Sequence, residues 1–172
     1  MVFKILDASA FYVGIPFASA EKSLTTPDVF NEIKHIKKDH KAIEMILETK
    51  RLEIMIPESE YINKVLFKSK TTGDFQNLSK GDISVIALCL QLKGELVTDD
   101  FAVSNLAKQL NLTVVPVMTT GITRIANWIY FCSGCEKTFS EISKCPICGN
   151  KLSRKLNKGK SSPSPVSDRA II

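Results

Sequence analysis

Four cysteines near the end of the chain constrain its fold more than any other feature. They form two Cys-x2-Cys pairs with nine residues between the pairs: Cys132, Cys135, Cys145 and Cys148. Each pair can present two thiolates from one tight turn, and two facing turns make a tetrahedral sulfur site for one structural Zn²⁺. Gly134 and Gly149 lie where such turns need a permissive residue. We therefore predict a small rubredoxin-like zinc ribbon over residues 127–156.

The composition indicates one domain of ordinary size with this small module attached. The chain has 172 residues, of which 44% are hydrophobic, and this suffices for a buried core. No apolar run reaches the roughly 20 residues of a membrane span, and the first residues lack a signal-peptide pattern. We therefore expect a cytoplasmic protein. In that compartment, paired cysteines favour metal binding over the alternative of two disulfides.

The positive charge is concentrated at the C-terminal end. Residues 1–150 contain 17 basic and 17 acidic residues, whereas residues 151–172 contain six basic residues and one acidic residue. A basic segment directly after a zinc ribbon favours contact with the phosphates of a nucleic acid. The Ser- and Pro-rich composition of residues 157–172 also predicts a disordered tail, and the two interpretations are compatible.

The rest of the chain alternates between strands and helices. The pattern predicts strands at residues 2–6, 52–56, 96–97 and 112–117, and helices near residues 25–32, 40–50, 61–68, 83–92 and 102–110. Such alternation predicts an α/β fold, with a central, mainly parallel sheet between helical layers in a three-layer α/β/α domain over residues 1–118. Residues 119–126 are predicted to be the linker to the ribbon.

Carboxylates from separate segments are predicted to meet at one edge of that sheet. Asp7 ends the first strand, and Asp99 and Asp100 end the strand at residues 96–97. Asp82 lies in the first turn of the helix that precedes that strand. In a right-handed crossover this helix begins at the edge where the parallel strands end. Glu32, in the second turn of its own helix, is a fourth contributor.

Such a cluster of carboxylates favours hard cations. Neighbouring carboxylates raise each other's pKa unless cations lie between them, and Mg²⁺ and Mn²⁺ prefer oxygen ligands and also bind phosphate oxygens. A bound ion of this kind can activate and orient a water, which predicts hydrolysis of a phosphodiester. Ser9 and Thr98 are expected to hydrogen-bond the acids or their waters. One or two metal ions are predicted to be held by Asp7, Asp82, Asp99 and Asp100.

Each acid also has a purely structural interpretation. Asp82 could only cap its helix, Asp99 or Asp100 could cap the following helix, and Glu32 could be an exposed helix acid. Asp7 is the hardest to explain structurally, because a carboxylate at the end of a buried strand is costly without a partner. The prediction therefore depends on the set of acids rather than on any member.

The segments around these acids resemble a known family, the PIN-domain nucleases. Residues 2–11 resemble its opening strand and turn, residues 78–88 resemble its central acidic helix, and residues 96–105 resemble its last acidic corner. A PIN-like domain followed by a four-cysteine ribbon is similar to one branch, the ribosome-biogenesis Nin-one-binding protein family in a compact archaeal form. The resemblance covers roughly residues 1–156.

The resemblance implies an Mg²⁺- or Mn²⁺-dependent endoribonuclease that leaves 5′-phosphate and 3′-hydroxyl ends. It implies that the substrate is precursor small-subunit rRNA, cleaved at its mature 3′ end within the pre-small ribosomal subunit and among its assembly factors. By position, the family's catalytic acidic quartet matches Asp7, Glu32, Asp82 and Asp100, with Asp99 replacing or assisting Asp100.

The resemblance also implies that the ribbon and nearby basic residues position the RNA. The candidates for RNA contact are Lys68, Lys70, Arg124, Trp128, Lys144, Lys151, Arg154 and Lys155. The alternative for each basic residue is a solvated surface charge, and the alternative for Trp128 is a place in the core of the ribbon. Two other functions remain open. One is a catalytically silent RNA-binding assembly factor. The other is a toxin-type PIN ribonuclease acting on tRNA or mRNA, a class that usually lacks a zinc ribbon.

Overall fold

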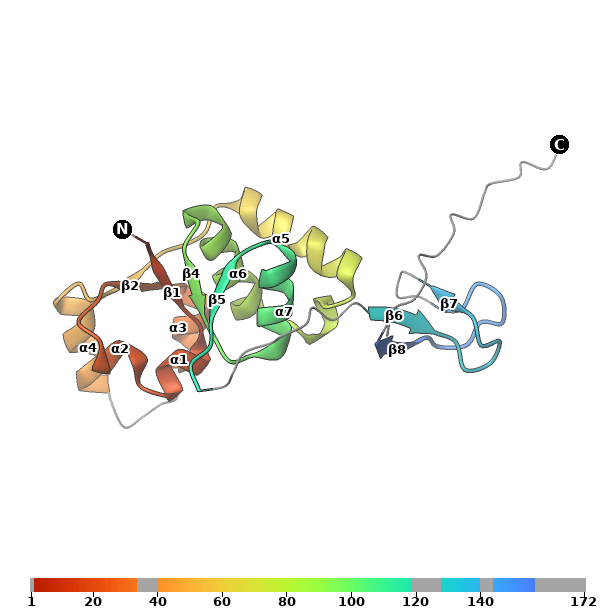
Figure 1. Cartoon of the computed structure of the whole chain (residues 1–172), viewed down its shortest axis with the longest axis horizontal. Helices are drawn as coiled ribbons and strands as arrows, with labels where there is room; N and C mark the ends of the chain where they lie inside the picture. Colours follow the sequence, from red (N-terminus) through yellow and green to blue (C-terminus); the bar gives the residue numbers. More distant parts are fainter. Residues whose placement is uncertain (1, 34–39, 119–127, 140–143, 157–172) are drawn as a thin grey trace.

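The structure is a computed structural model that describes residues 2–33, 40–118, 128–139 and 144–156. Its larger part contains a five-stranded sheet in the order β3-β2-β1-β4-β5 (Figure 1). All neighbouring strands of this sheet are parallel. The strands are β1 (Lys4–Leu6), β2 (Ser23–Thr25), β3 (Leu52–Ile54), β4 (Glu95–Val97) and β5 (Thr113–Val115).

Helices flank this sheet, which confirms the predicted α/β class. They are α1 (Ala8–Tyr12), α2 (Ile15–Ala18), α3 (Pro27–Ile33), α4 (His40–Glu48), α5 (Ser59–Thr72), α6 (Lys80–Leu92) and α7 (Phe101–Gln109), with a short 3-10 helix, η1 (Phe75–Asn77). The nearly all-apolar α6 packs against α3, α5, α7, β1 and β4, and its residues from Ile83 to Cys89 are buried. Within the described residues, none of the helices combines the length and apolar character needed to cross a membrane.

The strand β2 and the short helices α1 and α2 were not predicted from the sequence. The strand β2 is fully buried between β1 and β3, although two of its three residues carry hydroxyl groups. The Thr25 hydroxyl donates to the Leu6 carbonyl at 2.9 Å, and the Ser23 hydroxyl donates to the Arg51 carbonyl at 3.3 Å. These bonds satisfy the buried hydroxyls, so the strand is stable without the apolar pattern that marks the other strands.

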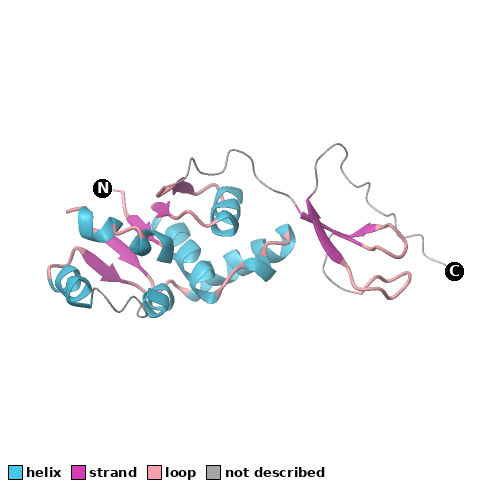
Figure 2. Ribbon diagram, turned by 90° about the horizontal axis from the view of Figure 1, so that it is seen from below, coloured by secondary structure: helices cyan, strands magenta, loops and turns pink. Residues whose placement is uncertain are grey.

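The smaller part is a three-stranded antiparallel sheet in the order β7-β6-β8. Its strands are β6 (Trp128–Phe131), β7 (Thr138–Phe139) and β8 (Ser153–Leu156). Its small core consists of Tyr130, Cys132, Cys145 and Leu152, with Cys135 and Phe139 packed against it. Figure 2 shows this sheet beside the end of α5. The predicted linker at 119–126 and tail at 157–172 lie outside the described residues.

Candidate acidic active site and zinc centre

Asp7 lies where the buried strand β1 ends and α1 begins. Its carboxylate is only 4% exposed and acts as the N-cap of α1, with Oδ1 accepting from the Ala8 amide at 2.7 Å. Its Oδ2 accepts from the Thr98 hydroxyl at 2.6 Å and from the Ser9 hydroxyl at 3.4 Å. Burial raises the pKa of Asp7 to about 6, although the Thr98 and Ala8 hydrogen bonds oppose the rise.

Asp82 occupies the third position of α6, where it completes a capping box. Its Oδ2 accepts from the Ser79 amide at 2.7 Å, while the Ser79 hydroxyl accepts from the Asp82 amide at 3.1 Å. Burial raises the pKa of Asp82, and the negative charge of Asp100 raises it further. The prediction that Asp82 can cap its helix is confirmed, and the charge of a second acid of the cluster still affects the pKa of its carboxylate.

Glu32 lies beside the first turn of α6, although it belongs to α3. Its Oε1 accepts from the Ser79 hydroxyl at 3.4 Å, and a Cβ atom on Gly81 would lie 2.5 Å from Oε1. The glycine therefore leaves room for this carboxylate. Burial raises the pKa of Glu32, with a smaller contribution from Asp82. Glu32 and Asp100 are the exposed acids of the cluster, whereas Asp82 is half-buried and Asp7 is buried.

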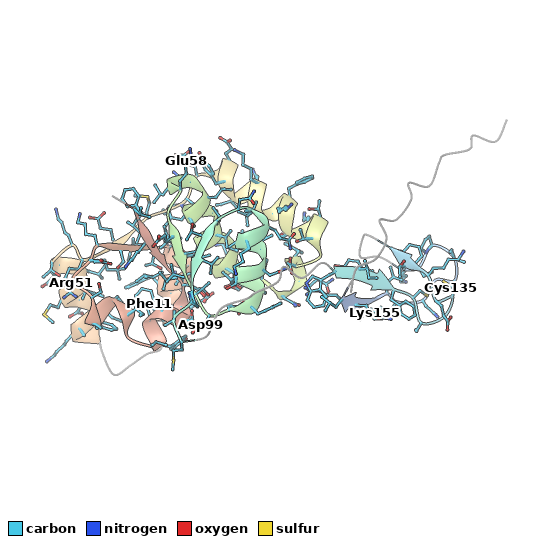
Figure 3. The ribbon with its side chains drawn as sticks, in the orientation of Figure 1. Phe11, Arg51, Glu58, Asp99, Cys135 and Lys155 are labelled. Atoms are coloured by element: carbon cyan, nitrogen blue, oxygen red, sulfur yellow. The ribbon has the colours of Figure 1, made fainter. Side chains whose placement is uncertain are left out.

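Asp99 and Asp100 have different partners, although they are adjacent. Asp99 accepts from two amides that follow β5, at 2.9 Å from Val117 N to Oδ1 and 2.8 Å from Met118 N to Oδ2. Asp100 is the N-cap of α7, with Oδ1 accepting from Val103 N at 2.9 Å. The negative charge of Asp100 adds to the effect of burial in raising the pKa values of Asp7 and Asp82. Figure 3 shows Asp99 at the edge of the domain.

The structure thus brings together the four acids that the resemblance implied: Asp7, Glu32, Asp82 and Asp100. Within the described residues, no lysine or arginine forms an ion pair with any of the four. Burial raises the pKa of Asp7, Glu32 and Asp82, and such carboxylates without a balancing cation are a donor set that a hard divalent ion stabilises. The chemistry of these donors suits such an ion, whereas among the described residues only the four cysteines bring their ligand atoms within 4.8 Å of one another.

The four cysteines of the ribbon form a compact sulfur cluster. All four Sγ atoms lie within 4.8 Å of one another. The Sγ atoms of Cys132 and Cys148 are 3.3 Å apart, and those of Cys135 and Cys145 are 3.5 Å apart. A disulfide requires about 2.05 Å, whereas four sulfurs at about 2.3 Å from one Zn²⁺ lie just under 4 Å apart. The cysteines are free thiols arranged as a metal site.

Backbone amides of the two turns favour the thiolate forms of Cys132 and Cys145. The Cys135 amide is the main cause of the lowered pKa of Cys132. Burial opposes ionisation of Cys145, but the amides of Cys148 and Ile147 lower the pKa of Cys145 to about 6. Because Zn²⁺ binds thiolates, these amides favour the metal-bound form at Cys132 and Cys145, whereas burial and the neighbouring sulfurs raise the pKa values of Cys135 and Cys148. Figure 3 shows Cys135 at the end of the ribbon that is remote from the α/β domain.

The predicted RNA-contact residues fall into different environments. Lys70, Lys144, Lys151 and Lys155 are exposed, and Lys68 is half-buried. Arg124 lies outside the described residues. Trp128 and Arg154 are engaged with Asp74, an acid that the sequence analysis did not single out. Asp74 follows a helix C-cap glycine within a polar stretch, so the sequence carries no sign that its carboxylate is buried.

The chain is similar to known ribonucleases over most of its length. Residues 5–92 match the family described as the PIN domain of ribonuclease. Endoribonuclease Nob1 of Methanocaldococcus jannaschii is 40% identical over 164 residues, which cover 93% of this chain and 81% of that protein. Endoribonuclease Nob1 of Pyrococcus abyssi is 31% identical, covering 86% of this chain and 90% of that protein.

A third relative matches a shorter segment. Ribonuclease VapC1 of Thermoplasma acidophilum is 38% identical over 111 residues, which cover 64% of this chain and 57% of that protein.

Proposed function

This chain belongs to the Nob1 family of PIN-domain endoribonucleases, and we propose that it cleaves precursor small-subunit rRNA at the mature 3′ end. The observation that carries the proposal is the acidic cluster around the buried Asp7, in a chain that aligns with an Endoribonuclease Nob1 over 93% of its length. The proposed setting is the cytoplasmic pre-small ribosomal subunit with its assembly factors.

The proposed catalytic machinery is the acidic quartet. Asp7, Asp82 and Asp100 would hold one or two divalent ions, for which we propose Mg²⁺ or Mn²⁺. Such an ion supplies positive charge for the phosphate and lowers the pKa of a bound water. Thr98 holds Asp7 Oδ2 and also accepts from the Asp100 amide at 3.0 Å, so one hydroxyl orients two of the acids.

We assign the released proton to Glu32. This residue is exposed, and partial burial of its carboxylate together with the charge of Asp82 raises its pKa above the ordinary value. A carboxylate with a raised pKa is a better proton acceptor near neutral pH than an ordinary one. The proposed products carry 5′-phosphate and 3′-hydroxyl ends.

The ribbon is proposed to have a structural rather than a catalytic role. Four thiolate ligands saturate tetrahedral Zn²⁺, so such a site offers no open position for water. The proposed domains are the nuclease domain at residues 1–118, the linker at 119–126, the ribbon at 127–156 and a basic tail at 157–172. The exposed Lys144, Lys151 and Lys155 are the ribbon residues proposed to contact phosphates.

The test is incubation of the full chain with a precursor rRNA fragment and Mn²⁺, with both product ends mapped. We expect cleavage at the mature 3′ end, leaving a 3′-hydroxyl, and no cleavage by Asp7→Asn. A cyclic 2′,3′-phosphate would indicate metal-independent chemistry instead. A catalytically silent assembly factor would bind the RNA without cleaving it and would not bind Mn²⁺ at the acids.

The match to Ribonuclease VapC1 supports a second candidate, a ribonuclease acting on tRNA or mRNA. The same assay with tRNA and mRNA in place of the precursor distinguishes the two. Cleavage of these RNAs at rates equal to that of the precursor would favour the second candidate. We prefer the first because the alignment with Endoribonuclease Nob1 covers 93% of this chain, against 64% for the VapC1 relative.

A further inference from the structure

Asp74 is a buried acid outside the acidic cluster. It follows Gly73, the left-handed C-cap residue of α5, and it is only 1% exposed. Burying a carboxylate is costly unless hydrogen bonds and opposite charge compensate for the lost water. Burial raises the pKa of Asp74, while the Thr72 hydroxyl and the Arg154 guanidinium act against the rise. The groups that hydrogen-bond to this carboxylate therefore determine its structural role.

The two oxygens of Asp74 bind different parts of the molecule. Among the described residues, Oδ2 accepts from the α/β domain, from Thr72 at 2.8 Å, Asn105 at 3.1 Å and Gln109 at 3.3 Å. In the same part of the chain, Oδ1 accepts from the ribbon, at 3.0 Å from Trp128 Nε1 and at 3.0 Å from an Arg154 guanidinium nitrogen. The Asp74 carboxylate is thus hydrogen-bonded to both the α/β domain and the ribbon.

The ribbon residues around Asp74 form a packed surface rather than a single contact. The Arg154 side chain is only 16% exposed, and its guanidinium lies 3.8 Å from the centre of the Trp128 ring. A Cβ atom on Gly73 would lie 3.2 Å from Trp128 Cβ and 3.3 Å from the Tyr130 hydroxyl oxygen. The glycine therefore permits close approach of β6. Figures 1 and 2 both show β6 beginning beside the end of α5.

We propose that Asp74 docks the ribbon onto the α/β domain and thereby positions RNA held by the ribbon at the acidic cluster. The proposal rests on the proposed function for its second half, because positioning matters only if RNA is cleaved. Asp74, Trp128 and Arg154 are positioning residues in this scheme. Trp128 and Arg154, which the sequence analysis assigned to RNA contact, act through Asp74.

The physical basis is the asymmetry of a buried ion pair. Removing one partner leaves a buried charge that is stable only if water reaches it, so loss of Arg154 favours separation of the ribbon from Asp74. The ribbon would then move relative to the α/β domain, and RNA bound to it would meet the acids in many orientations. A loss of orientation of this kind weakens catalysis without altering the catalytic groups.

The first arm of the test is ¹⁵N relaxation of the full chain loaded with zinc. In the wild type we expect ribbon and α/β-domain amides to report one overall correlation time. In Arg154→Met and Trp128→Phe we expect a clearly shorter time for the ribbon, with unchanged zinc content. Asp74→Asn tests the other side of the contact. The control is Glu53→Gln, which alters an exposed ion pair of equal 3.0 Å length, that with Lys22.

The second arm compares two RNA substrates. For a structured precursor that reaches both ribbon and cluster, we expect KM of Arg154→Met to rise roughly tenfold. For a short oligonucleotide that reaches only the cluster, kcat should stay within about twofold of the wild-type value. Arg154→Lys, which keeps a donor near Asp74, should recover part of the KM loss and part of the common tumbling.

Two results would overturn the docking proposal. One is a ribbon that tumbles faster than the α/β domain in the wild-type chain. The other is common tumbling of ribbon and α/β domain together with an unchanged KM in Arg154→Met, Trp128→Phe and Asp74→Asn. If neither RNA is cleaved by the wild type while the relaxation results hold, the proposed function fails but the docking role of Asp74 stands.

Discussion

The Thr98 hydroxyl donates to Asp7 Oδ2 at 2.6 Å, joining residues 91 positions apart in the chain. The same hydroxyl oxygen accepts from the Asp100 amide at 3.0 Å. Because Thr98 follows β4 and Asp7 follows the adjacent β1, this single side chain fixes the spacing of two acids from different strands. The chemistry proposed for the cluster depends on that spacing.

We predict that Asp7→Asn abolishes cleavage but stabilises the protein at pH 7 in the absence of Mg²⁺ and Mn²⁺. The folded-state pKa of Asp7 is raised from 3.8 to about 6, so its ionisation lowers stability as the pH rises across that interval. At roughly 1.4 kcal/mol per unit, the neutral amide should increase the free energy of unfolding by up to about 3 kcal/mol. Urea denaturation measures this. Equal stability of the two proteins at pH 7 would contradict it.

Manganese affinity should fall as the pH decreases below about 6, because Mn²⁺ must displace the proton of Asp7. The loss should approach tenfold per pH unit if one proton is released. Isothermal titration calorimetry in buffers of different ionisation enthalpy measures both the affinity and the number of protons. A pH-independent affinity between pH 5 and pH 7 would show that Asp7 is not a ligand.

Thr98→Val should destabilise the protein by about 1–2 kcal/mol, because the buried Asp7 carboxylate loses its shortest donor. The pKa of Asp7 should rise further, since the Thr98 hydrogen bond now holds it down. The acid limb of the pH–rate profile should therefore move to higher pH. The matched control is Thr113→Val on the exposed start of β5, which should leave the profile in place.

Asp99→Asn and Asp100→Asn should have opposite effects. Asp99 uses both oxygens for the Val117 and Met118 amides, so its replacement should cost about 1–2 kcal/mol of stability and leave manganese affinity nearly unchanged. Asn serves as well as Asp at a helix N-cap, so Asp100→Asn should keep stability but weaken manganese binding. Thermal unfolding and calorimetry on both variants give the answer. Reversed effects would make Asp99 the principal ligand.

The double variant Cys132→Ser with Cys135→Ser should release zinc and unfold residues 127–156 alone. A Zn²⁺-bound ribbon of this size owes its fold to the metal, whereas the α/β domain has its own core. Metal analysis and ¹H–¹⁵N spectra follow the two parts separately. Loss of the signals of residues 1–118 would show that the two parts do not fold independently.

The sequence by itself determined the features that depend on local spacing. The two Cys-x2-Cys pairs predicted the sulfur cluster, because two thiols three positions apart meet in one turn. The position of Asp82 in the first turn of its helix allowed it to be a cap, and the capping box that it forms with Ser79 confirms this. The strand–helix alternation predicted the parallel sheet, and with it the edge at which Asp7, Asp82 and Asp100 meet. Their catalytic roles stay predictions.

Only the tertiary structure decided which polar side chains are buried and what they contact. β2 carries too few apolar residues to be recognised, and its hydroxyls are satisfied by carbonyls from other segments. Asp99 and Asp100 are indistinguishable in the sequence, yet amides after β5 bind one of them. Asp74 accepts from Trp128 and Arg154, 54 and 80 positions away. Contacts at such separations leave no periodic pattern, because they depend on how whole elements pack.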